Sequence, residues 1–287
     1  MKNAAFVLLV ALLAGVALAS PAAANSNWMR DPDAAFAAAT RDGKLVLVDL
    51  FAEWCGWCKV MDQQVFSTAE FQTWADRFVL LRVDVEDGAA GSDLRDRFNI
   101  NNLPTLLLLD GARSRVGAVQ GFQPLDKLVR AVERELESYG RLAAAADKAI
   151  AQGGSAQVLR SLASQFHDRM DGRRAAALFA KLLEDKSVVA PDSFWIRLAQ
   201  VDAYRIATDF KSAHGELEAL RKAARAAEPT LRERIELERF FLARTERDCG
   251  AARSALADFA KDYPSSTYLA DARRSLKTLK VDGAQCS

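Results

Sequence analysis

Two cysteines, Cys55 and Cys58, stand three positions apart where an apolar run ends and a helical pattern begins. The first turn of a helix carries unsatisfied backbone N–H groups and a partial positive charge, so a sulfur placed there is stabilised as the thiolate. The thiolate attacks disulfides, and a second sulfur one helical turn away can displace the first partner. This spacing predicts a redox-active disulfide, with Cys55 as the exposed attacking sulfur and Cys58 as the resolving one.

A structural staple and half of a zinc site are the alternatives for this pair. A disulfide across two intervening residues closes almost no loop, so it stabilises little. A zinc site needs two further ligands, and the other cysteines, Cys249 and Cys286, stand far along the chain. We therefore expect no metal ion. The chain also lacks a nicotinamide or flavin motif, so we expect no cofactor.

A carboxylate precedes the dithiol in the same apolar run. Asp49 lies within the strand expected over 44–51, where its neighbours are apolar. Burial disfavours the ionised form, so the pKa of Asp49 should be raised. This residue is then placed to exchange the proton of the resolving thiol as a general acid or base. The alternative is an aspartate at the edge of a strand that faces water.

The elements that must position these residues alternate between helix and strand. Asp42-Gly43 should end the first helix, the capping box at 67–70 should open the third, and Gly140 should end the last. Interleaved strands and helices that finish with a hairpin and a helix predict a central sheet covered by helices. The expected helices cover 32–42, 55–66, 67–78, 92–98 and 124–139, and the expected strands cover 44–51, 79–85, 105–109 and 115–120.

After Gly140 the strand signals vanish, which predicts a separate all-α domain. Helix starts near Asp192, Thr230 and Ser265 recur at the interval typical of paired-helix repeats. We divide the chain into a signal peptide (1–24), an α/β domain (25–140) and a helical domain (141–287). The helices expected in the last domain cover 141–151, 155–168, 171–184, 192–208, 211–226, 230–245, 249–261 and 265–279.

Residues 44–137 resemble the thioredoxin family. The likeness rests on the Trp-Cys-x-x-Cys-Lys turn at 54–59, the carboxylate Asp49 and the Leu-Pro-Thr segment at 103–105. The segments 65–67 and 102–105 are most similar to the C-terminal periplasmic domain of the transmembrane thiol reductases called DsbD. The resemblance implies an α/β thioredoxin fold with a central mixed sheet. The stretch 259–266 resembles the junction between helices in tetratricopeptide-like repeats.

The resemblance also implies a substrate-binding rim. In thioredoxin-like proteins the residue matching Pro104 is a cis proline beside the dithiol, which leaves the backbone of Leu103 free to pair with a bound polypeptide. Trp57 is either a substrate contact on this rim or a bulky spacer. The dipeptide Gly56-Trp57 differs from the Gly-Pro of reducing thioredoxins and from the Pro-His of the strong periplasmic oxidant. The direction of electron flow therefore stays open.

The N-terminus has the layout of a secretory signal peptide. Lys2 precedes an apolar run over 4–19, and small residues lead to an expected cleavage after Ala24. An uncleaved anchor is the alternative, although the run is short for a bilayer span. We expect an exported, soluble protein of a bacterial periplasm, where disulfides persist. Cys249 and Cys286 are then expected to form a structural disulfide, with a second redox relay as the alternative.

The charge pattern limits the partners. The chain has 39 basic and 38 acidic residues in an interleaved pattern, which does not favour nucleic-acid binding. Our first hypothesis is a reductase of disulfide-containing proteins that receives electrons from a membrane thiol reductase. The alternatives are a disulfide oxidase or isomerase, and a protein-binding scaffold whose helical repeats recruit a client.

Overall fold

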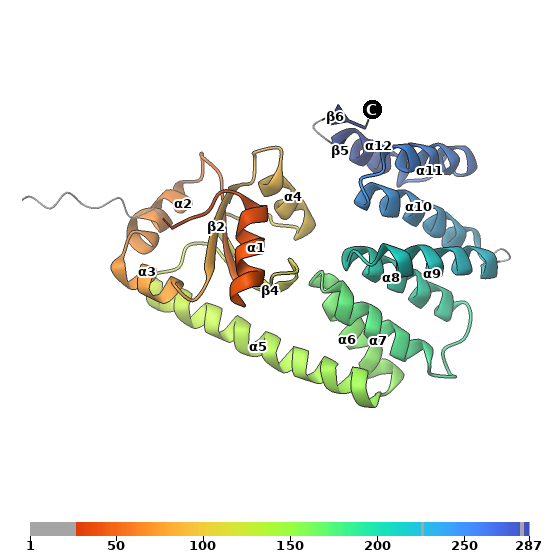
Figure 1. The fold of residues 1–287 in the computed structure, drawn as a ribbon, viewed down its shortest axis with the longest axis horizontal. Helices are drawn as coiled ribbons and strands as arrows, with labels where there is room; N and C mark the ends of the chain where they lie inside the picture. The colour runs from red at the N-terminus through yellow and green to blue at the C-terminus, as the bar shows by residue number, and fades with distance from the viewer. Residues whose placement is uncertain (1–26, 225–226, 282–283, 287) are drawn as a thin grey trace, which may run out of the picture.

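The computed structural model describes residues 27–224, 227–281 and 284–286. It contains an α/β half and a helical half, and the long helix α5 (Leu125–Gln152) runs from one to the other (Figure 1). The expected signal peptide and its cleavage after Ala24 lie outside the described residues. Within those residues, no helix is both long and apolar enough to cross a membrane.

The sheet of the α/β half is mixed, as expected. It has the order β2-β1-β3-β4, in which β1 (Val46–Phe51) pairs in parallel with β2 (Val79–Asp84) and antiparallel with β3 (Thr105–Leu109). β4 (Arg115–Gln120) lies at the edge beside β3. All six residues of β1 are buried because helices cover both faces, which explains its nearly continuous apolar sequence.

Two apolar clusters hold the helices against the sheet. On one side, α1 (Pro32–Asp42) and α4 (Ala90–Arg97) pack against alternate residues of β1. On the other, α3 (Ala69–Ala75) and α5 pack against β3 and β4. A β-strand turns successive side chains to opposite faces, so β1 contributes to both clusters. This layered arrangement confirms the expected α/β fold.

Two local expectations in this half need correction. The helix expected over 55–66 divides into α2 (Gly56–Met61) and a five-residue π-helix, Asp62–Phe66. The N-cap of α3 is Thr68 rather than Ser67, because the Thr68 hydroxyl accepts the Phe71 N–H at 3.2 Å. Serine and threonine both cap helices, so the sequence alone did not separate the two neighbours.

The expected helix end at Gly140 is wrong, because α5 continues through it to Gln152. The residues that follow are rich in alanine, the strongest helix former, and they offset the cost of one glycine, about 1 kcal/mol. The division that we place at 140 therefore falls inside a continuous helix.

The second half is helical, with helices packed in succession along the chain. Its helices are α6 (Ala156–Asp168), α7 (Gly172–Leu183), α8 (Asp192–Ile206), α9 (Phe210–Ala223), α10 (Pro229–Thr245), α11 (Cys249–Asp262) and α12 (Leu269–Thr278). A short antiparallel hairpin, β5 (Lys280–Val281) with β6 (Ala284–Gln285), follows α12. The sequence pattern did not predict this hairpin because two-residue strands carry no periodicity. A disulfide joins Cys249, the first residue of α11, to Cys286 beyond β6.

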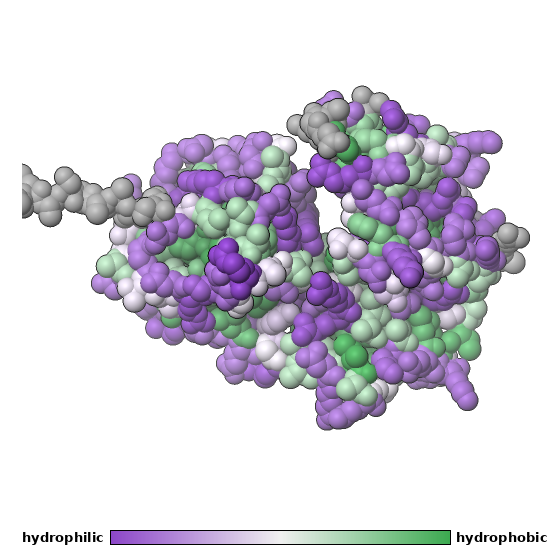
Figure 2. Space-filling view, viewed as in Figure 1, coloured by the Kyte–Doolittle hydropathy of each residue, from purple (hydrophilic) through white to green (hydrophobic). Residues whose placement is uncertain are grey.

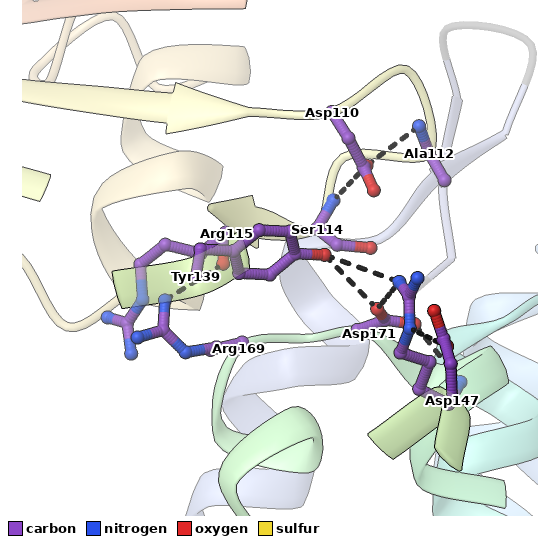
Figure 3. A network of polar contacts seen from close by, with 9 residues as sticks. Asp110, Ala112, Ser114, Arg115, Tyr139, Asp147, Arg169 and Asp171 are labelled. Carbon is purple, nitrogen blue, oxygen red and sulfur yellow. Dashed lines mark hydrogen bonds and ion pairs between the residues drawn. The ribbon is translucent and has the colours of Figure 1, made fainter. Parts of the chain in front are cut away.

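The two halves meet along the edge strand β4. The Arg115 N–H donates to the Arg169 carbonyl at 2.7 Å, and the Arg169 guanidinium donates to the Val116 carbonyl at 2.9 Å. Nearby, the Tyr139 hydroxyl donates to Asp171 at the start of α7 at 3.5 Å (Figure 3). Arg174 also forms an ion pair with Asp171. The helical half thus satisfies part of the free edge of the sheet. Figure 2 shows the halves in contact below and separated by an opening above.

Candidate redox site

The dithiol lies directly after the buried strand β1, at the start of α2. Cys55 is the N-cap residue of α2, and its Sγ accepts the Cys58 N–H at 3.1 Å. The two sulfurs are joined in a disulfide, with their Cα atoms 5.3 Å apart. A backbone N–H directed at Sγ stabilises negative charge on that sulfur. The geometry therefore favours Cys55 as the thiolate once the bond is reduced.

The low exposure of Cys55 differs from our expectation. Cys55 is 4% exposed and Cys58 is 3% exposed, so Cys55 is not the exposed sulfur of the oxidised pair. Both belong to the apolar cluster that packs α1 and α4 against the sheet. Packing in this cluster accounts for the low exposure of Cys55.

A buried group of charges includes Asp49, on the strand β1 that leads to the dithiol. Asp49 is 1% exposed, and its Oδ2 lies 3.1 Å from Nε of Arg82 on the neighbouring strand β2. Arg82 also binds both carboxylate oxygens of Asp62, with Nη2 to Oδ2 at 2.7 Å. Its guanidinium lies over the Phe51 ring, 4.3 Å from the centroid. Arg82 is thus shared between a fully buried and a half-buried carboxylate.

The surroundings of Asp49 explain its protonation. Burial raises the pKa of Asp49 to about 7, although the positive charge of Arg82 opposes this rise. Among the described residues neither oxygen of Asp49 accepts a hydrogen bond. The direction of this shift is the one expected from the apolar strand. Asp49 is therefore poised to bind and release a proton near neutral pH.

A cavity of about 270 Å³ leads to this region. Its walls include Cys58, Asp62 and Arg82, together with the exposed side chains of Glu53 and Lys59. The resolving cysteine and the charged group below it therefore share one opening. Such an opening is large enough for several waters, which can carry protons.

The rim of the dithiol combines a proline loop with aromatic side chains. The Leu103–Pro104 peptide is cis, and the Pro104 carbonyl accepts the Gly121 N–H at 2.8 Å. Trp54 and Trp57 are 67% and 62% exposed, unusually high for tryptophan. In the described part of the chain, no hydrogen bond engages the backbone of Leu103.

Sequence reasoning missed Arg82, Asp62 and Phe122. Arg82 interrupts the apolar run of β2 as Asp49 interrupts that of β1, so the same signal was available for it. Asp62 and Phe122 carry no comparable signal, because both come from segments of mixed polarity. Among the described residues no group of three or more His, Cys, Asp or Glu side chains is arranged to hold a metal ion.

Comparisons with known proteins find relatives of the α/β half. A family model described as thioredoxin-like matches residues 27–111. The chain is 40% identical over 89 residues to the thiol:disulfide interchange protein DsbD of Cronobacter sakazakii, a match that covers 30% of this chain and 16% of that protein. It is 33% identical over 70 residues to thioredoxin-T of Drosophila melanogaster, covering 24% of this chain and 41% of that protein.

A solved structure also matches this half. The solution structure of a thioredoxin from Thermus thermophilus is 28% identical, with a TM-score of 0.35, and the match covers 38% of this chain and 85% of that one. The chain thus spans a small part of its curated DsbD relatives, and the matched part contains the dithiol. Residues 27–111 of this chain belong to a thioredoxin-like domain, which β4 and α5 complete, with a Cys-x-x-Cys disulfide at Cys55 and Cys58.

Proposed function

We propose that this protein is an exported thiol–disulfide oxidoreductase that reduces disulfides in other proteins. The observation that carries the proposal is the Cys55–Cys58 disulfide at the N-terminus of α2, which directly follows the strand that carries Asp49 and shares an opening with Arg82, the partner of Asp49. A dithiol in this setting has an activated sulfur, a resolving sulfur and a group that titrates near neutral pH.

The proposed reaction transfers two electrons from the reduced dithiol to a substrate disulfide. The Cys55 thiolate attacks one substrate sulfur, a Cys55–substrate disulfide forms, and the other substrate sulfur leaves and takes up a proton. The Cys58 thiolate then attacks Cys55 Sγ, which releases the second substrate sulfur. The products are a substrate dithiol and the Cys55–Cys58 disulfide.

In this scheme Asp49 moves the proton of the resolving thiol. With a pKa of about 7, its ionised form accepts the Cys58 proton as that sulfur becomes the nucleophile. Arg82, on β2, pairs with the Asp49 carboxylate, and Asp62 places a second negative charge against the same guanidinium. Cys58 and Arg82 line the same opening, so water there can carry the proton between the Cys58 thiol and Asp49.

Regeneration of the dithiol requires an external thiol reductant. The relatives named thiol:disulfide interchange protein DsbD support a donor of this class, and we assign the role to a membrane thiol reductase facing a bacterial periplasm. In the proposed arrangement the helical half binds a client protein. The contact of Arg169 with β4 would hold that client at a fixed position relative to the dithiol.

The test is the equilibrium of the Cys55/Cys58 couple in a glutathione buffer, followed by turnover of a protein disulfide such as that of insulin. Reductases and strong oxidants of this class differ by about 150 mV. A potential near that of thioredoxin with insulin turnover supports a reductase, whereas a potential near that of the strong oxidants makes the protein an oxidase or isomerase. Full complementation of a deletion strain by a Cys55→Ser, Cys58→Ser variant would instead favour the scaffold.

A further inference from the structure

The ring of Phe122 supports the exposed indole of Trp57 beside the dithiol. We propose that Phe122 is a positioning residue, and that the ledge formed by Trp57 and Phe122 selects disulfides flanked by uncharged, apolar peptide. This inference rests on the proposed function and specifies its substrate class.

The contact between the two rings is close and nearly parallel. Their centroids are 5.7 Å apart, and the ring planes meet at 25°. Phe122 is partly buried and packs against the apolar cluster that holds α5 to the sheet. Trp57, by contrast, is 62% exposed. The anchored ring therefore fixes the orientation of the exposed one, which limits the rotamers that Trp57 can adopt.

The loop that carries Phe122 is itself fixed to the proline segment. Gly121 has φ +77°, a backbone conformation that favours glycine, and its N–H donates to the Pro104 carbonyl at 2.8 Å. The hydrogen bond joins the loop after β4 to the segment before β3. The dithiol turn, the proline loop and the loop after β4 are thus connected through Trp57, Phe122 and Gly121.

The chemistry of this side of the dithiol indicates the partner. Asn102 donates its side-chain amide to Gln120 Oε1 at 3.3 Å, and Leu103 lies between Asn102 and Pro104 in the chain. These groups and the aromatic ledge carry no charge. The charged residues Glu53 and Lys59 belong instead to the cavity that opens on Cys58. An uncharged, apolar segment beside the substrate cysteine can cover the indole without burying an unpaired charge.

The experiment compares two disulfide-linked peptides that differ only in the residues flanking the cysteine, leucine in one and aspartate in the other. We expect the wild-type protein to prefer the leucine peptide in kcat/KM, chiefly through KM. Phe122→Leu should reduce this preference by about fivefold, the size expected from an aromatic pair. Phe122→Tyr keeps the ring and should restore the preference. Phe194→Leu, in the helical half, is the matched control and should leave the preference at its wild-type value.

A double-mutant cycle keeps the test decisive. If Phe122 acts through Trp57, then Trp57→Leu and Phe122→Leu should reduce the preference by no more together than either does alone. Should Phe122→Leu fail to fold, loss of the preference in Trp57→Leu with retention in Phe122→Tyr carries the same conclusion. A wild-type protein that reduces both peptides equally overturns this inference and leaves the proposed function intact. A wild-type protein that reduces neither overturns both.

Discussion

The Nε atom of Arg82 lies 3.1 Å from the Asp49 carboxylate, and both side chains are almost completely buried. A buried ion pair of this kind is rarely retained for stability, because the desolvation of two charges offsets their attraction. The second carboxylate, Asp62, binds the two terminal nitrogens of the same guanidinium, and neither Asp49 oxygen has a hydrogen-bond partner among the described residues. Charge attraction alone therefore opposes the protonation of Asp49 that burial favours.

Asp49→Asn should remove a pH dependence of both stability and reduction. The pKa of Asp49 is raised from 3.8 to about 7, so the folded protein binds this proton more tightly than the unfolded chain. The stabilisation is complete below pH 3.8 and is lost as the pH rises to about 7, which corresponds to about 4 kcal/mol. Urea unfolding from pH 4 to pH 8 should therefore show a falling stability in the wild-type protein.

In Asp49→Asn that fall should be reduced, and the rate of disulfide reduction should lose its dependence on pH near 7. Asp76→Asn, an exposed position at the end of α3, is the matched control. An unchanged pH–rate profile in Asp49→Asn would contradict the assigned proton transfer.

His167→Gln should weaken the helical half most at acidic pH. The hydrogen bond to Asp202, with Nε2 to Oδ2 at 2.5 Å, raises the pKa of His167 from 6.5. The sign follows from tighter proton binding in the folded state. The contribution is complete below pH 6.5 and is lost as the pH rises through the higher folded value.

Thermal unfolding at pH 5.5 and pH 8.5 should show a larger loss of Tm for His167→Gln at the lower pH, by about 2 to 4 °C. His214→Gln is the control, since His214 pairs with Glu246 but is 56% exposed at its side chain. Equal losses at the two pH values would remove the His167–Asp202 pair as the cause.

Arg169→Met should loosen the contact between the two halves. Its guanidinium donates to the carbonyls of Arg115 and Val116, so the variant leaves two acceptors at the sheet edge without this donor. The free energy of unfolding should fall by about 1 to 3 kcal/mol. Small-angle X-ray scattering should show a larger radius of gyration than for Arg173→Met, an exposed neighbour. The same radius for both variants would mean that the Arg169 side chain is not needed to hold the two halves together.

Cys249→Ser, Cys286→Ser should destabilise the helical half without abolishing disulfide reduction. The bond spans 37 residues, and a loop of that length corresponds to about 4 kcal/mol. Denaturant unfolding of the double variant measures this loss. Cys55→Ser, Cys58→Ser is the contrasting control, because that bond spans three residues and should contribute little stability. Loss of turnover in the Cys249 and Cys286 variant would instead support a second redox relay.

Local sequence determined much of the candidate site. The spacing of Cys55 and Cys58, the apolar neighbours of Asp49 and the position of Pro104 are all visible in short segments. Strand and helix periods are local as well, so the layered α/β half and most helices of the second half could be predicted. Local signals failed where context outweighed them. Gly140 reads as a helix end, but the alanine-rich continuation and packing of α5 carry the helix through it.

Only the tertiary structure decided which distant residues meet at the dithiol. Arg82 reaches Asp49 because β1 and β2 pair in parallel with these two residues in register. Trp57 meets Phe122 because the loop after β4 returns to the proline segment through the Gly121 hydrogen bond. Hydrophobic periodicity indicates which side of a helix or strand is buried, but it does not indicate the register of that element or which element lies beside it. Register and neighbours depend on the long-range packing of the whole sheet. They bring Arg82 to Asp49 and Phe122 to Trp57.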